Sequence, residues 1–369
     1  MNILSVLWNR EISTGAHSRL LHLLQGLADR GHGISLIRRS GAEYETRSVE
    51  VIEVSSRGFP SNKLDSLLSV FCGGTSERVN DCDLVLCFGI GGAVPGVYLK
   101  HHLAVPMLLG LRSYPIENIV KRGGFEESVY RFTISTYLRA ILLGADRVVM
   151  QTECQREKLV RNYSVSQEKT SVIRNNIIGD LKQPKESTRA EQLLFAGTLN
   201  YRKGIDTLLR ALPPLIASEN IHLHVAGDGP MRNDAERFVE KNGLRECVTF
   251  HGYVDEIQVL MRRTDLVVVP SRFDSFPNVA LEAMRVGTPF IASDIMDVRS
   301  AFGPATQYVP VNDPESLAEK LASLQRPDQY SELRDQCMSH RTEFDFDWVG
   351  EFESEMTKLL QSTGSEDRL

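Results

Sequence analysis

The chain has 369 residues, 42% of them hydrophobic and 24% charged, with a formal net charge of −6 at pH 7. This composition excludes an intrinsically disordered chain and gives no reason to expect a nucleic-acid partner, while the length predicts two domains. Six cysteines without CxxC spacing, and no apolar run near the roughly 20 residues of a membrane span, argue against a zinc site, a disulfide framework and a transmembrane helix.

Short apolar runs alternate with amphipathic stretches through the first half of the chain. The first run lacks the basic start of a signal peptide, so we expect a strand there and a reduced, cytoplasmic protein. A helix is predicted at 17–32, and strands are predicted at 2–8, 33–39, 83–89, 105–111 and 145–151. This alternation predicts a doubly wound parallel sheet. The pattern ends at 171–176, and the polar stretch 179–192 is the expected linker.

The same alternation restarts in the second half and predicts a second α/β domain. Helices are expected at 203–215 and 229–243, and strands at 192–197, 221–227, 247–252, 265–270 and 288–293. The region from about 314 to 361 has a helical pattern, and its stripe of Trp348, Phe352, Met356 and Leu359 indicates packing. We therefore predict domains at 1–178 and 179–343, with the helix at about 344–361 packed back on the first domain.

The stretch SRFDSFPNVALEAM, at 271–284, places Asp274 and Glu282 eight positions apart. It follows a buried strand and is expected to form a loop and then a helix that starts near Pro277, with Ser275 as N-cap and Gly287 as C-cap. In an open α/β sheet such a loop faces the ligand crevice.

The predicted helix start supplies unpaired backbone N–H groups that favour an anion, around Phe276, Pro277, Asn278 and Val279. Two carboxylates beside a phosphate would repel it, but they suit the hydroxyls of a sugar and a ribose. The pattern therefore indicates a nucleotide-sugar site. The alternative is that Asp274 only caps the helix and that Glu282 lies on the surface.

A second motif, AGTLNYRKGIDTLLRAL at 196–212, places Lys203 at the end of a strand and the start of a helix. A cation is unfavourable at that end of a helix dipole, which favours a role in binding a diphosphate over a solvated Arg202–Lys203 pair. Weaker signals come from the turns AGDGPM and HGYVDE, and from Thr14 and Gly15 after the first strand.

These motifs resemble the retaining glycosyltransferases of family 4 (glycosyl transferases group 1), which have the GT-B fold. The resemblance covers nearly the whole chain and is strongest at 193–293, where FAGTLNYRKGID, AGDGP, FHGYV and the acid–seven residues–Glu motif occur in order. It implies two Rossmann-like domains facing a cleft, with the donor bound by the second domain and the acceptor mainly by the first.

The resemblance also implies roles for single residues. Glu282 would bind the ribose, Asp274 the donor sugar, and Lys203, with Arg202, the diphosphate. The donor-binding set is Gly15, Gly197, Thr198, Gly229, Tyr253, Val254, Ser275, Phe276, Pro277, Asn278 and Val279. On the acceptor side we place Arg112, Ser113 and Thr14.

The chain departs from the family pattern at three points. Asp274 stands where Glu is usual, Thr198 where Arg often follows the glycine, and Arg112 or Ser113 where a His is frequent. These departures bear on the identity of the donor and on the detail of catalysis.

The expected activity is that of a hexosyltransferase-type enzyme (EC 2.4) that uses a UDP- or GDP-sugar, needs no metal or other cofactor, and acts on a glycan or lipid-linked acceptor in cell-surface polysaccharide or glycoconjugate synthesis. Two alternatives stay open: a hydrolysing sugar-nucleotide epimerase of the same fold, and a catalytically weak sugar-nucleotide-binding or scaffold subunit. The basic and aromatic stretch at about 117–139 could contact the inner face of a membrane, or form an ordinary helix with a solvated basic face.

Overall fold

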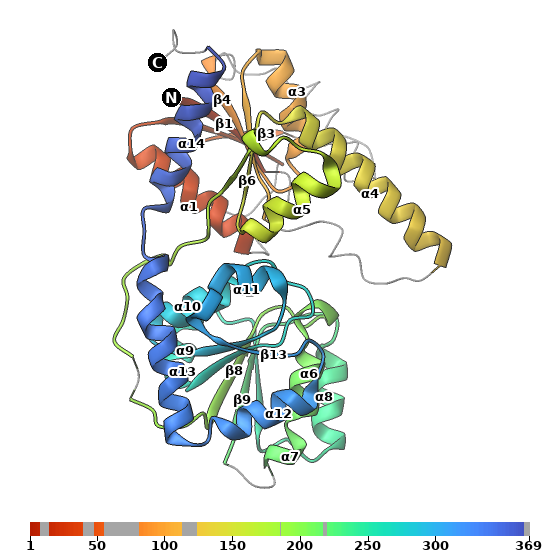
Figure 1. Cartoon of the computed structure of the whole chain (residues 1–369), viewed down its shortest axis with the longest axis vertical. Helices are drawn as coiled ribbons and strands as arrows, with labels where there is room; N and C mark the ends of the chain where they lie inside the picture. Colours follow the sequence, from red (N-terminus) through yellow and green to blue (C-terminus); the bar gives the residue numbers. More distant parts are fainter. Residues whose placement is uncertain are drawn as a thin grey trace. The chain divides into compact units, whose positions relative to one another are not determined.

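The computed structural model describes residues 1–7, 15–39, 48–54, 81–112, 124–184, 186–216 and 220–364. It divides into two compact units: Met1–Ile173 together with Asp347–Leu369, and Arg174–Phe346. Each unit has its own parallel sheet (Figure 1).

Within the described residues, the sheet of the first unit has seven parallel strands in the order β3-β2-β1-β4-β5-β6-β7. The strands are β1 (Asn2–Leu7), β2 (Gly33–Arg39), β3 (Glu50–Val54), β4 (Leu84–Phe88), β5 (Met107–Gly110), β6 (Arg147–Met150) and β7 (Thr170–Val172). Their helices are α1 (Gly15–Asp29), α3 (Ala93–Leu103), α4 (Gly124–Gly144), α5 (Glu153–Tyr163) and α14 (Trp348–Ser362). The central strands β4 and β5 are fully buried, as expected for a sheet covered on both faces.

The C-terminal helix α14 packs against α1 in this unit (Figure 1). Gly26 of α1 permits a close approach, because a Cβ there would lie 2.7 Å from Val349 Cγ2. The predicted stripe on α14 is buried, with Trp348, Phe352, Met356 and Leu359 at most 2% exposed. The prediction that this stripe serves packing is confirmed.

In the described part of the second unit the sheet has six parallel strands in the order β10-β9-β8-β11-β12-β13. They are β8 (Gln192–Ala196), β9 (His222–Ala226), β10 (Val248–Gly252), β11 (Leu266–Val269), β12 (Phe290–Ser293) and β13 (Gln307–Val309). The helices are α6 (Ile205–Ala211), α7 (Pro213–Ile216), α8 (Arg232–Lys241), α9 (Ile257–Arg263), α10 (Asn278–Val286), α11 (Met296–Phe302), α12 (Pro314–Ser323) and α13 (Pro327–His340).

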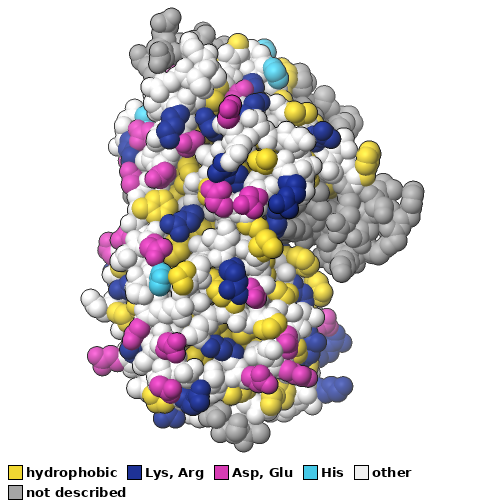
Figure 2. Space-filling view, in the orientation of Figure 1, with side chains coloured by type: hydrophobic (Ala, Val, Ile, Leu, Met, Phe, Trp, Pro, Cys, Tyr) yellow, Lys and Arg dark blue, Asp and Glu magenta, His cyan; other side chains and the backbone are white. Residues whose placement is uncertain are grey.

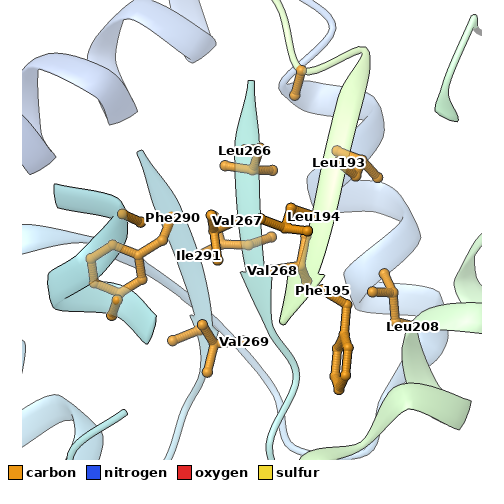
Figure 3. Packing of buried hydrophobic residues seen from close by; sticks show 14 of the residues in the cluster. Leu193, Leu194, Phe195, Leu208, Leu266, Val267, Val268, Val269, Phe290 and Ile291 are labelled. Carbon is orange, nitrogen blue, oxygen red and sulfur yellow. The ribbon is translucent and has the colours of Figure 1, made fainter. Parts of the chain in front are cut away.

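The core of the second unit is built on its central strands. Side chains of β8, β11 and β12 pack together beside Leu208 of α6 (Figure 3). Each fully buried Leu, Val or Phe stabilises the fold by about 1.5–3 kcal/mol relative to an exposed one. The run LVVV of β11 therefore forms a rigid base for the loop that follows it.

The predicted helix at 203–215 is wrong in detail. Residues Tyr201–Lys203 form a 3-10 turn, Gly204 has φ 70°, and the regular helix α6 begins only at Ile205. A left-handed residue interrupts the helical hydrogen bonding, and Pro213 then starts a separate short helix, α7.

Both sheets reverse their winding direction at one position, between β1 and β4 in the first unit and between β8 and β11 in the second. Ligands of open α/β sheets bind beyond the carboxyl ends of the strands at this switch point. The predicted class, two doubly wound Rossmann-like sheets, is confirmed.

On the face drawn in Figure 2, basic and acidic side chains are interspersed rather than gathered by sign.

Candidate active site at the switch point of the second sheet

Two loops meet at the switch point of the second sheet, one after β8 and one after β11. The N–H of Arg272 donates to the carbonyl oxygen of Arg202 over 2.8 Å. A Cβ at Gly204 would lie 2.0 Å from the carbonyl oxygen of Pro270, so only glycine allows the two backbones to approach this closely. The two predicted motifs therefore lie in contact, although Lys203 and Asp274 are 71 residues apart in the sequence.

At this junction Lys203 and Asp274 form an ion pair. Lys203 Nζ donates to Asp274 Oδ2 over 2.5 Å, and the two side chains are 18% and 9% exposed. Asp274 Oδ2 also accepts from Ser271 Oγ over 3.3 Å, and Oδ1 accepts from the N–H of Ser275 over 3.0 Å.

The pKa of Asp274 is lowered by this environment. Burial is the largest influence and raises the pKa, but the positive charges of Lys203 and Arg202, with the hydrogen bonds from Lys203 and Ser275, outweigh it. Asp274 is therefore held as a carboxylate whose closest partner is Lys203, and its contact with a hydroxyl of the donor sugar stays a prediction.

The turns after β9 and β10 extend the same row of loops. Gly197 N donates to Ala226 O over 2.9 Å, and Gly227 N donates to Gly252 O over 2.6 Å. A Cβ at Gly227 would lie 2.0 Å from Gly197 O, and one at Gly229 would lie 2.5 Å from Leu199 O. These glycines allow the backbones of neighbouring loops to pack together.

The helix α10 starts one residue later than predicted, and its N-cap is Pro277, whose side chain makes no capping hydrogen bond. The prediction that Ser275 is the N-cap is wrong, because the helix begins only at Asn278 and Ser275 lies two residues before the cap, where its N–H donates to Asp274 Oδ1. Gly287 ends the helix with φ 82°, as predicted.

The first turn of α10 and its approach contain both buried and half-buried residues. Phe276 is 5% exposed and packs on Phe302 with ring centroids 4.9 Å apart, so its side chain belongs to the core. Asn278 Oδ1 accepts from Asn175 Nδ2 over 2.8 Å. Val279 and Glu282 are half-buried on the same helix.

Three further predicted donor residues lie in the loops after β8 and β10. Thr198 is exposed, Tyr253 is 81% exposed, and Val254 packs partly against the core. An exposed aromatic ring at Tyr253 is free of core packing and can stack on a planar group.

The predicted residues of the first unit are described only in part. Thr14 and Ser113 lie outside the described residues, and Gly15 is the first residue of α1. The guanidinium of Arg112 lies 5.3 Å from the ring centroid of Phe88 and 5.8 Å from that of Trp348. Burial and the nearby Arg19 hold the pKa of Arg112 well below its usual value.

The residue that sequence reasoning missed is Arg272. Its side chain is 4% exposed and pairs with Asp206 of α6 at 2.7 Å. Arg272 lies three residues after the end of β11 and two before Asp274, but nothing in this local pattern distinguishes it from a solvated arginine.

The described residues contain neither a metal-binding cluster nor a membrane-spanning helix. No group of three or more His, Cys, Asp or Glu side chains is arranged to hold a metal ion there. Nor is any helix in that part of the chain both long enough and apolar enough to cross a membrane.

Two family models match the chain. "Glycosyltransferase Family 4" matches residues 13–177, and "Glycosyl transferases group 1" matches residues 190–326. Among curated relatives, an uncharacterised glycosyltransferase of Methanocaldococcus jannaschii is 27% identical over 302 residues, which are 74% of this chain and 75% of the relative. Glycogen synthase of Mycobacterium tuberculosis is 26% identical over 69% of this chain and 63% of its own length.

Solved structures share the fold. Sucrose-phosphate synthase from Thermosynechococcus elongatus superposes with a TM-score of 0.80 at 20% identity, over 98% of this chain and all of that one. HepE of Anabaena, in complex with UDP and glucose, has a TM-score of 0.76 at 16% identity, over 98% of this chain and all of its own. The architecture is the GT-B fold, and the chain belongs to the glycosyltransferases of family 4 and group 1.

Proposed function

We propose that this glycosyltransferase moves a sugar from a UDP- or GDP-sugar to a hydroxyl of a glycan or lipid-linked acceptor, with retention of the anomeric configuration. The observation that carries the proposal is the Lys203–Asp274 pair at the switch point, just before the start of α10. HepE, a structural neighbour solved with UDP and glucose, supports a UDP donor.

In this proposal the leaving diphosphate is met by positive charge. Lys203 and Arg202 neutralise it, and the N–H groups at the start of α10 add the partial charge of a helix N-terminus. Glu282 accepts from the ribose hydroxyls, Asp274 faces the donor sugar, and Tyr253 and Val254 flank the base. The half-buried position of Glu282 on α10 supports its share of this role.

The transfer breaks the bond between the anomeric carbon and the phosphate oxygen, and the acceptor oxygen forms its new bond on the same face. The acceptor's proton passes to the departing phosphate, so no separate base is needed. We propose that no metal takes part, because Lys203 already supplies a cation at the diphosphate. Turnover should therefore be unchanged by EDTA, and a loss restored by Mg²⁺ or Mn²⁺ would reject this part of the proposal.

We propose that the first unit binds the acceptor, in cell-surface polysaccharide or glycoconjugate synthesis, and that the region at about 117–139 rests on the inner face of the membrane. Phe132 of α4 is 74% exposed, which supports an interfacial role for this helix. Pelleting with anionic and with neutral vesicles tests the contact. Equal recovery with both would remove it.

A thermal-shift screen against UDP-, GDP-, ADP- and TDP-sugars tests the donor, because a ligand that binds only the folded state raises its melting temperature. We expect one base to stand out. The selected donor is then incubated with an acceptor panel, and product anomers are assigned by NMR. A product of inverted configuration would reject retention, and no shift with any sugar nucleotide would reject the donor class.

A further inference from the structure

The guanidinium of Arg272 is enclosed by the second unit. Its side chain is 4% exposed, and both terminal nitrogens meet one carboxylate: Nη1 donates to Asp206 Oδ1 and Nη2 to Asp206 Oδ2, each over 2.7 Å. Its Cζ atom lies 4.2 Å from the ring centroid of Tyr201. This two-point pairing fixes the orientation of the guanidinium as well as its position.

The remaining donors of Arg272 are also occupied. Nη1 donates to the carbonyl oxygen of Tyr201 over 2.8 Å, and Nη2 donates to Thr207 Oγ1 over 3.0 Å. Asn312 Oδ1 accepts from Nε over 3.0 Å and from Nη2 over 2.6 Å. All five N–H groups of the guanidinium therefore have protein partners, and Arg272 has no donor left for a substrate.

These bonds tie Arg272 to the loop before Lys203, and the chain itself connects Arg272 to Asp274. On one side, Arg272 binds Tyr201 through its side chain and Arg202 through its backbone N–H, the two residues directly before Lys203. On the other side, Asp274 follows Arg272 by two residues in the same loop. We therefore expect a change in the Arg272 side chain to alter the position of Lys203 relative to Asp274.

We infer that Arg272 is a positioning residue, which sets Lys203 and Asp274 at the distance and angle needed to receive the diphosphate of the donor. This inference rests on the proposed role of Lys203. Arg272 itself does not touch the donor, and its effect on nucleotide binding passes through Lys203.

A double-mutant cycle tests this, with Lys203→Met and Arg272→Lys made singly and together. The probes are UDP, GDP, ADP and TDP, and the dissociation constant of the tightest one is measured by calorimetry. We expect each single variant to bind about tenfold more weakly, the loss of one charge-assisted hydrogen bond. In the Lys203→Met background, Arg272→Lys should cost less than about twofold, because coupled residues are not additive.

The control is Arg299 on α11, which also forms a two-point pair, with Asp294 (2.8 and 2.7 Å), and lies 4.4 Å from the ring centroid of Tyr308. Arg299→Lys should leave nucleotide affinity unchanged in both backgrounds. If Arg272→Lys does not fold, Asn312→Gly is the second variant. It removes one acceptor and keeps a backbone that has φ 59°. We expect about a threefold loss, again only when Lys203 is present.

The outcomes separate the inference from the function. If no nucleotide binds the native chain, or if Lys203→Met binds as tightly as the native chain, the proposed function fails and the inference with it. If Lys203→Met weakens binding but Arg272→Lys and Asn312→Gly either have no effect or have the same effect in both backgrounds, the function stands and Arg272 is only structural.

Discussion

Replacing Lys203 by Met removes the cation that lies 2.5 Å from Asp274 Oδ2 and keeps the apolar stem of the side chain. Asp274, 9% exposed, then keeps the N–H of Ser275, a longer contact with Ser271 and the field of Arg202. Stranding a fully buried charge costs about 3–5 kcal/mol. Because Lys203 is 18% exposed and water can enter its place, we expect a loss of about 2 kcal/mol at pH 7.

The loss should depend on pH with a defined sign. In the native chain the pKa of Asp274 is lowered, so this carboxylate stabilises the fold above its unfolded pKa of about 3.9, and the contribution disappears as pH falls through the folded pKa. Without Lys203, burial is opposed by fewer charges and the pKa of Asp274 rises. The carboxylate then destabilises the fold at pH 7, and protonation removes that cost.

The assay is urea unfolding at pH 7, 5.5 and 4, followed by hydrogen exchange of peptides from 190–346, which separates the second unit from the first. Lys203→Met should be least stable relative to the native chain at pH 7 and approach it at pH 4. The double variant with Asp274→Asn should recover to within about 1 kcal/mol of the native chain, since neither charge is then stranded. An equal loss at pH 7 and pH 4 would refute the reasoning.

Three further outcomes follow from single residues. Glu282→Ala should weaken nucleoside-diphosphate binding by about 1–3 kcal/mol in calorimetry, and unchanged affinity would reject its ribose role. At Gly227 a Cβ would lie 2.0 Å from a backbone oxygen, and φ is 134°, so Gly227→Ala should cost at least about 2 kcal/mol of unfolding free energy. The control Gly243→Ala, which has open space around it, should cost about 1 kcal/mol. Equal losses would refute the packing argument. Burial, then two neighbouring histidines, lowers the pKa of His224 to about 4, so stability should rise from pH 4 to 6.5. Because the ring is partly exposed, the effect should be about 1 kcal/mol, and His224→Gln should flatten the profile in urea titrations.

The central strands could be predicted because a buried parallel strand is a short, almost entirely apolar run, and few other elements have such a sequence. Leu266–Val269 and Leu84–Phe88 are such runs, and both are fully buried. The edge strand β10 was predicted, but the edge strands β3 and β13 were not. Glu50–Val54 is partly exposed, and Gln307–Val309 has only three residues, so neither carries a long apolar signal.

The sequence places Lys203 and Asp274 at the same crevice, but it does not predict that they form an ion pair. Each motif places its residue after a strand, but their separation depends on β8 and β11 being neighbours in the sheet. Arg272 lay beyond sequence reasoning for the same reason. Its partners Asp206 and Asn312 are 66 and 40 residues away, and no local pattern distinguishes a buried arginine from a solvated one.

The hydrogen bonds that Asp274 already accepts limit how it can contact a sugar in the proposed donor site. A carboxylate has about four acceptor positions, and Asp274 already uses three, for Lys203, Ser271 and Ser275. A donor hydroxyl can therefore take the remaining position on Oδ1, or replace the long 3.3 Å bond from Ser271. In the proposed site either arrangement keeps the bond between Asp274 and Lys203, and Arg202 adds a second positive charge beside this pair. The contact with the sugar then depends on the same bond that holds the cation at the diphosphate. Changing either residue should alter sugar preference and nucleotide affinity together.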